Sequence, residues 1–487
     1  MKRIYLTILL ILATNLAFSQ NWEMKTGAAS EALQFGSKDF FTSNDFVGAT
    51  SDIIIMLRYK DNKQQSPYLV SYDHNLVMLH TLDLPIDKKQ KYYVCGFNNG
   101  IIDLLETCEE QDNLVTNHIS LNAASLELKN REQLGTYKRD AHSQFLFVKS
   151  QNDSVFATIF LSPSGNEASC KVTLYNSYAE ELWNTQYYTG LLNDIIVTDS
   201  GEVAMIGYTT SPKSKITHIQ FTLLDGDKES VFDLNKDLED PFRLQLLGYR
   251  NGKFYVSGLI KSSLWKDDSR YDNAMGFITL TYDGPSESVS AYERHTATIK
   301  EFCAIENYPV KSISEDDIHM LGMKVVSSVV DEDGVIFMLQ ETYDLYYSLS
   351  FDRTNYFGFF LVKLDVDGNV SWIKAIRHDS AGVGNKLKRC SKYKIIPSGD
   401  KYMLFYLEKP KNLTKNENKF YDLVTPGRNG AKQLMATTIN RQGEISNQFF
   451  TIPKKSLPLG APHTLPDGKL LILFTQSNSS FTALFNQ

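Results

Sequence analysis

The sequence contains little cysteine, with five residues in a chain of 487. These residues stand far apart, at Cys95, Cys108, Cys170, Cys303 and Cys390. Zinc sites place cysteine or histidine ligands a few residues apart, and neither these cysteines nor the nine histidines have that spacing. We therefore expect buried, unpaired thiols rather than disulfide bridges, and no metal site.

Positive charge is not concentrated anywhere along the chain, and the net charge is −7. Proteins that bind nucleic acid neutralise phosphates with clustered Lys and Arg, so nucleic acid is not an expected partner. The chain also lacks a Gly-x-Ser-x-Gly motif and a glycine-rich phosphate-binding loop. The sequence therefore supplies no candidate catalytic residue and no cofactor.

Long apolar runs are absent after the first nineteen residues. At the N-terminus, Lys2 and Arg3 precede an apolar run over residues 4–12, and Ala17-Phe18-Ser19 supplies small residues for cleavage before Gln20. A retained membrane anchor is the alternative, but the run is shorter than the ~20 residues that a span needs. We expect a signal peptide over residues 1–19 and an exported chain, periplasmic or secreted, with no transmembrane segment.

Helical periodicity is absent over long windows, and the 28 Phe and 26 Tyr residues favour strands. A recurrent hairpin has an apolar strand, a turn of Asp, Asn, Ser and Gly, and a second apolar strand. Glycine and asparagine suit these turns because two-residue hairpins need positive φ. The eight turns are Thr50-Ser51, Asn98-Asn99-Gly100, Asn152-Asp153, Asp199-Ser200-Gly201, Asn251-Gly252, Asp333-Gly334, Ser398-Gly399-Asp400 and Pro466-Asp467-Gly468.

A second type of hairpin follows the first, and residues 361–374 are its clearest copy. Its turn, Asp365-Val366-Asp367-Gly368-Asn369, alternates acidic oxygens as calcium loops do, but it lacks the downstream Glu of an EF-hand. We interpret it as a hairpin turn. Two hairpins make a four-stranded unit of about fifty residues, which is typical of a β-propeller blade.

The two ends of the chain complete one such unit. Residues 457–487 have the pattern of only three strands, whereas Trp22 stands in a segment similar to those around Trp183 and Trp372. The fold class is therefore all-β: a β-propeller of four-stranded blades, eight in number with seven as the alternative, closed by the N-terminal strand. Residues 20–487 form a single domain, and we interpret the three tryptophans as packing between blades.

The pattern of residues 361–374, Leu-x-Lys-Leu-Asp-x-Asp-Gly-Asn-x-x-Trp-x-Lys, resembles the propeller repeats of secreted bacterial proteins. It is more distantly similar to the tryptophan-bearing repeat of quinoprotein-like propellers. The resemblance covers essentially the whole chain after the signal peptide and is strong at residues 193–235 and 325–376. It implies a binding or assembly module, although some such propellers are enzymes.

The two faces of the expected ring differ. Turns from the first to the second strand and from the third to the fourth are short, and we call their side the tight-turn face. The opposite side, the long-loop face, carries the insertions at residues 260–273, 343–356, 408–431 and 296–324. Aromatic and Arg residues on long loops are frequent anchors of binding surfaces. The candidate binding residues are Trp265, Tyr271, Tyr346, Tyr347, Arg353 and Tyr356.

These observations favour a non-catalytic binding or scaffolding propeller of the cell envelope or exterior, whose partner is a protein or a glycan. The alternative is a carbohydrate-cleaving enzyme, which needs two or three carboxylates converging on the central pocket. An aromatic rim of insertions would support the binding protein, and clustered inward carboxylates would support the enzyme. The aromatic rings would otherwise only pack the loops onto the scaffold.

Overall fold

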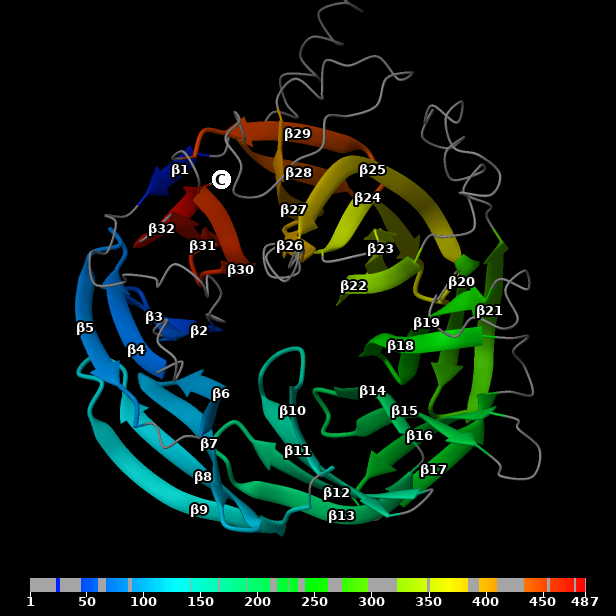
Figure 1. The fold of residues 1–487 in the computed structure, drawn as a ribbon, viewed down its shortest axis with the longest axis horizontal. Coiled ribbons are helices and arrows are strands. Elements are labelled where there is room, and N and C mark those ends of the chain that lie inside the picture. Colours follow the sequence, from blue (N-terminus) through cyan, green and yellow to red (C-terminus); the bar gives the residue numbers. More distant parts are fainter. Residues whose placement is uncertain are drawn as a thin grey trace, which may run out of the picture.

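Eight four-stranded antiparallel sheets form a ring around a central axis, so the protein is an eight-bladed β-propeller (Figure 1). The predicted fold class and blade number are confirmed, and the seven-bladed alternative is wrong. The computed structural model describes residues 23–26, 45–59, 67–85, 90–140, 142–164, 167–189, 191–210, 217–226, 228–234, 241–261, 274–296, 322–347, 351–383, 394–409, 433–452, 456–476 and 479–486.

The blades follow one another in chain order. Blade 1 comprises β2 (Asp45–Ala49), β3 (Ile53–Tyr59), β4 (Pro67–Asp73) and β5 (Met78–Asp83). Blade 2 comprises β6 (Lys91–Asn98), β7 (Ile101–Glu110), β8 (Asn113–Asn122) and β9 (Leu128–Lys138). Blade 3 comprises β10 (Gln144–Lys149), β11 (Val155–Ser164), β12 (Glu167–Asn176) and β13 (Glu181–Thr189). Blade 4 comprises β14 (Leu191–Val197), β15 (Val203–Thr210), β16 (Thr217–Asp225) and β17 (Lys228–Asp233).

The second half of the ring repeats this order. Blade 5 comprises β18 (Pro241–Arg250), β19 (Lys253–Lys261), β20 (Ala274–Asp283) and β21 (Ser288–Thr296). Blade 6 comprises β22 (Gly322–Asp331), β23 (Gly334–Tyr347), β24 (Phe351–Leu364) and β25 (Val370–Val383). Blade 7 comprises β26 (Ile396–Ser398), β27 (Lys401–Glu408), β28 (Gln433–Asn440) and β29 (Ile445–Phe450). Blade 8 comprises β30 (Ser456–Thr464), β31 (Leu470–Gln476), β32 (Ser479–Asn486) and β1 (Glu23–Thr26).

Each blade runs outward from the axis. Figure 1 shows the first strand of every blade next to the axis and the last strand at the rim. All eight predicted turns lie between the first and second strands of a blade. Asn99 and Gly100 illustrate the reason, since their φ angles of 50° and 71° are those of a tight hairpin turn. Positive φ recurs in the first turn of seven blades, and the Thr50-Ser51 turn of blade 1 forms without it.

The N-terminal strand closes the ring. Strand β1 pairs antiparallel with β32, and Met24 lies opposite Phe485, so the predicted closure is confirmed. Trp22 itself lies outside the described residues. Met24 also packs against a buried cluster that includes Phe450 and Phe485. The two ends of the chain therefore share one sheet and one part of the core.

The core is divided among the interfaces between neighbouring blades. Between blades 4 and 5, for example, Phe221, Phe254 and Tyr282 form a buried aromatic cluster, with Phe221 and Tyr282 ring centroids 4.5 Å apart. Propellers have such a core because both faces of every sheet are covered by the adjacent blades. Cys95 and Cys170 are buried free thiols, and burial raises the pKa of Cys170 to about 12. Cys303 and Cys390 lie outside the described residues.

In the part of the chain that the structure describes, no helix is both long and apolar enough to cross a membrane.

Candidate functional site

Four of the six predicted binding residues lie on one hairpin of blade 6. Tyr346 and Tyr347 are in β23, and Arg353 and Tyr356 are in β24. The register places Tyr346 opposite Asp352 and Tyr347 opposite Phe351. Trp265 and Tyr271 lie outside the described residues. The structure therefore groups four candidates on one pair of long, adjacent strands.

The expectation that residues 343–356 form a loop is wrong. Strands β23, β24 and β25 are each 14 residues long, and β25 still pairs with β24 at Arg353 and Val383. The segment is rich in aromatic residues, which suit strands, and strand pairing satisfies its backbone polar groups. We call residues 341–347, 351–358 and 377–383 the blade 6 extension. It lies on the long-loop face, because it prolongs the connection between the second and third strands.

The tight-turn face is fastened from blade to blade. Trp183 Nε1 donates to the Gly201 carbonyl of blade 4 at 3.2 Å, and Trp372 Nε1 donates to the Arg441 carbonyl of blade 7 at 2.9 Å. The predicted inter-blade role of these two tryptophans is confirmed. Lys253 and Asp367 join blades 5 and 6 by an ion pair of 2.8 Å.

Blades 6 and 7 share a buried charged cluster on the same face. Lys363 Nζ, whose side chain is 4% exposed, lies 3.1 Å from Asp331 Oδ1 and 2.9 Å from the Tyr402 hydroxyl. Tyr402 also donates to Asp331. Burial acts to raise the pKa of Asp331, but the hydrogen bonds from Tyr402 and Lys363 outweigh it and hold that pKa below its usual value. The cluster is an inter-blade tie.

A central cavity of about 550 Å³ lies at the tight-turn end of the axis. Within the described parts of the chain, seven blades contribute to its wall, mainly through the last residues of their first strands and the turns that follow. Sequence reasoning missed it because no single segment contains it. The cavity lies at the opposite end of the axis from the predicted binding surface.

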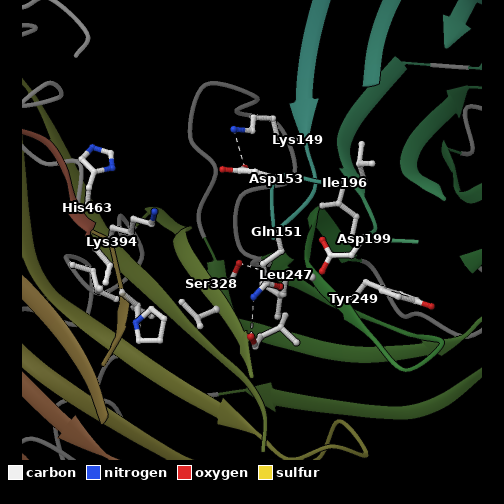
Figure 2. A pocket seen from close by; sticks show the side chains of 18 of the residues that line it. Lys149, Gln151, Asp153, Ile196, Asp199, Leu247, Tyr249, Ser328, Lys394 and His463 are labelled. Atoms are coloured by element: carbon white, nitrogen blue, oxygen red, sulfur yellow. Dashed lines mark hydrogen bonds and ion pairs between the residues drawn. The ribbon is translucent and has the colours of Figure 1, made fainter. Parts of the chain in front are cut away.

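The turn between β10 and β11 reaches across the cavity. Gln151 Nε2 donates to the Val330 carbonyl at 3.0 Å and so connects blade 3 directly to blade 6 (Figure 2). Ser328 donates to the Leu247 carbonyl at 2.7 Å beside it. Gly248 allows this close packing, because a Cβ there would lie 2.2 Å from Val330 Cγ2. These contacts hold the turn of blade 3 against blades 5 and 6.

Charged groups stand on two sides of the cavity in Figure 2. On one side, Lys149 Nζ and Asp153 Oδ1 form an ion pair of 2.9 Å, and Asp199 Oδ1 accepts the Asn152 N–H at 3.0 Å. Lys394 and His463 stand on the other side. Burial, together with the nearby Lys394 ammonium, lowers the pKa of His463 to about 4, so the imidazole is neutral at pH 7.

The carboxylates do not favour the carbohydrate-cleaving alternative. Among the described residues that line the cavity, Asp153 and Asp199 carry the carboxylates, and each is held by a structural partner. Glycoside hydrolysis needs carboxyl groups on both sides of the scissile bond. Among the described residues, Asp153 and Asp199 are instead bound to Lys149 and to the Asn152 N–H.

A second cavity, of about 290 Å³, lies between blades 2 and 3 towards the long-loop face. Tyr93, Phe145 and Phe160 supply aromatic surface, and burial raises the pKa of Tyr93. Arg139 and Glu109 form an ion pair at its edge. In the sequence, the only signal of this cavity is the pair of aromatic residues Tyr93 and Phe145, which stand near the starts of the first strands of blades 2 and 3.

Two further groups of polar residues are structural. Asp365 Oδ1 accepts the N–H groups of Asp367 and Asn369, each at 2.9 Å, which confirms the hairpin-turn interpretation of that loop. In blade 2, Asp103 Oδ1 lies 2.9 Å from His118 Nε2 and 2.8 Å from Ser120 Oγ. Ser120 and Asp103 approach the same imidazole nitrogen, whereas a catalytic triad uses both nitrogens.

Within the ranges that the structure describes, no three His, Cys, Asp or Glu residues are grouped so that they could hold a metal ion.

Comparison with known proteins identifies no family. No family model matches the sequence, and no curated protein matches it. Among solved structures, the chain is similar to the β-propeller domain of the Trilobed protease from Pyrococcus furiosus, with 8% identity, a TM-score of 0.38, and coverage of 85% of this chain and 97% of that one.

Two other solved structures are similar to the same degree. Polysaccharide lyase Uly1 has 10% identity and a TM-score of 0.43, with 95% of this chain and 94% of that chain covered. The WD40 domain of Toxoplasma gondii coronin has 11% identity and a TM-score of 0.36, with 90% and 91% covered.

Proposed function

We propose that this protein is an exported, non-catalytic binding or scaffolding propeller of a bacterial cell envelope or exterior. Its long-loop face recognises a protein or a glycan, through a surface that includes Tyr346, Tyr347, Arg353 and Tyr356. Trp265 and Tyr271, on the insertion of the preceding blade, belong to the same surface. The charged, apolar and small-residue pattern over residues 1–19 supports export, and the mass of the mature N-terminus tests it.

The observation that carries this proposal is the blade 6 extension. Three strands of one blade lengthen together on the face where the connections are long. Ring packing needs no such length, since the equivalent strands of blade 4 have 8, 9 and 6 residues. The opposite face has short turns fastened to the next blade, which leaves less adaptable surface for a partner.

Alanine substitutions in the extension test the proposal. A variant with Tyr346→Ala, Tyr347→Ala and Arg353→Ala is compared with the parent for binding to envelope protein fractions and to a glycan array. We expect binding to fall by about 30-fold or more, because even one aromatic or Arg anchor contributes ~2 kcal/mol at a binding surface. The melting temperature of the variant reports whether the fold is intact.

The matched control is on the tight-turn face. Tyr178 and Val366 are exposed there, at 52% and 46%, so Tyr178→Ala and Val366→Ala remove exposed apolar surface without touching the extension. We expect the control to bind like the parent. If the extension variant melts early and binds normally, its side chains stabilise the extension and do not contact a partner. Loss of binding in the control would place the partner on the tight-turn face.

A further inference from the structure

The two sides of the central cavity carry opposite net charge. On the side of blades 3 and 4, Lys149 offsets Asp153, and Asp199 leaves one negative charge. On the side of blades 7 and 8, Lys394 carries one positive charge beside the neutral imidazole of His463. Blades 3 and 4 lie across the axis from blades 7 and 8 (Figure 1). The described lining is therefore dipolar and neutral overall.

The charged side chains face the space between them. Figure 2 shows the Asp199 carboxylate directed towards the cavity and the Lys394 side chain extending towards it from the other side. Both residues are exposed rather than buried in protein. The Asn152 N–H fixes Asp199 through Oδ1, so this carboxylate is positioned before any ligand arrives.

Apolar side chains line the space between the two charged sides. Leu247 of blade 5 and Val329 of blade 6 contribute to this lining, and Phe46 stacks on His463 with ring centroids 5.1 Å apart. A cavity of about 550 Å³ is within the usual size range of small-molecule sites, and its described lining exposes about as much polar as apolar surface.

We propose that the central cavity binds a short peptide with free termini, whose carboxylate contacts Lys394 and whose ammonium contacts Asp199. A ligand with one charge would leave the opposite side unpaired, whereas a zwitterion satisfies both. A short peptide separates its two charges by several bonds and offers apolar side chains to the lining between them. This site is separate from the surface of the proposed function, so each can fail without the other.

The test uses tri-alanine and two capped forms of it as probes for the full exported chain. N-acetyl-tri-alanine lacks the ammonium, and tri-alanine amide lacks the carboxylate. We expect calorimetry to detect tri-alanine binding and each cap to weaken it about tenfold or more, since each removes a charged hydrogen bond.

Two variants assign the termini. In Lys394→Met we expect tri-alanine and its amide to bind equally weakly, because the partner of the carboxylate is gone. In Asp199→Asn we expect tri-alanine and its acetylated form to bind equally weakly; this substitution keeps an oxygen for the Asn152 N–H. Lys91→Met, at the cavity between blades 2 and 3, is the control and retains the discrimination between all three probes.

Several outcomes would overturn the proposal. Absence of tri-alanine binding to the parent at millimolar concentration would refute it, as would capped probes that bind as tightly as the free peptide. Discrimination that persists in both variants would place the peptide elsewhere. Equal affinity for alanine and tri-alanine would overturn the assignment to a peptide. Thermal melting of each variant shows that the loss is not one of folding.

Discussion

At the scale of single residues, His463 shows how the ring places a titratable group in an unusual environment. Its imidazole stacks on Phe46 from blade 1 and lies near Lys394 from the segment before β26. Burial and this ammonium both disfavour the protonated form, which lowers the pKa of His463 from 6.5 to about 4. Folding therefore opposes protonation of this residue.

The sign of the pH dependence follows from that shift. Above pH 6.5 the residue is neutral in both folded and unfolded chains; between pH 6.5 and 4 the unfolded chain binds a proton that the folded chain does not. Stability is therefore lost as the pH falls through this range. We expect His463→Phe, which keeps the ring stack, to remove about 1–2 kcal/mol of the stability loss between pH 7 and 5. Urea unfolding of parent and variant at both pH values measures it, and identical pH dependence would contradict the shift.

At the scale of elements, the ties between blades differ in burial, and their contributions to stability should differ accordingly. Lys363 is 4% exposed and bound to Asp331 and Tyr402, whereas Lys253, paired with Asp367, is 25% exposed. Removing one member of a buried pair leaves its partner uncompensated. A pair near the surface is screened by water and contributes less.

Methionine at each lysine tests this difference with similar side-chain length. We expect Lys363→Met to lower the free energy of unfolding by ~2–4 kcal/mol, and Lys253→Met to lower it by less than ~1 kcal/mol. Denaturant unfolding of the two variants against the parent gives both values. Equal losses would show that burial does not govern these ties.

The sequence predicts features that depend on neighbouring residues and misses features that depend on residues far apart in the chain. Seven of the eight first turns are predictable because positive φ at residues such as Asn251 and Gly252 is a local demand on residue type. The sequence of the blade 6 extension predicts a loop, because its mixture of aromatic and charged residues is compatible with a loop and with a strand. Its pairing with β25 decides for the strand. The central cavity depends on contacts such as that between Gln151 and Val330, 179 residues apart, which no local pattern encodes.

At the scale of the whole molecule, the sheet of blade 8 joins the two ends of the chain. The register of β1 places Glu23 opposite Asn486 and Thr26 opposite Ala483. Every other sheet is built from strands that follow one another in the chain. Without β1, strand β32 becomes an exposed edge and the cluster around Phe485 loses Met24.

Deletion of residues 20–30 therefore tests whether closure supports the whole ring. Each net backbone hydrogen bond contributes ~1 kcal/mol, so we expect the free energy of unfolding to fall by roughly 3 kcal/mol or more. A cooperative shift of the entire thermal transition is expected, since every blade depends on its neighbours for a covered face. Lys25→Pro, within β1 and opposite Leu484, removes one amide donor and should shift the same transition by less. Calorimetry of both variants against the chain starting at Gln20 measures the shifts. A truncated chain that melts like that parent would show that closure by β1 is dispensable, and that the remaining strands of blade 8 hold the ring by packing alone.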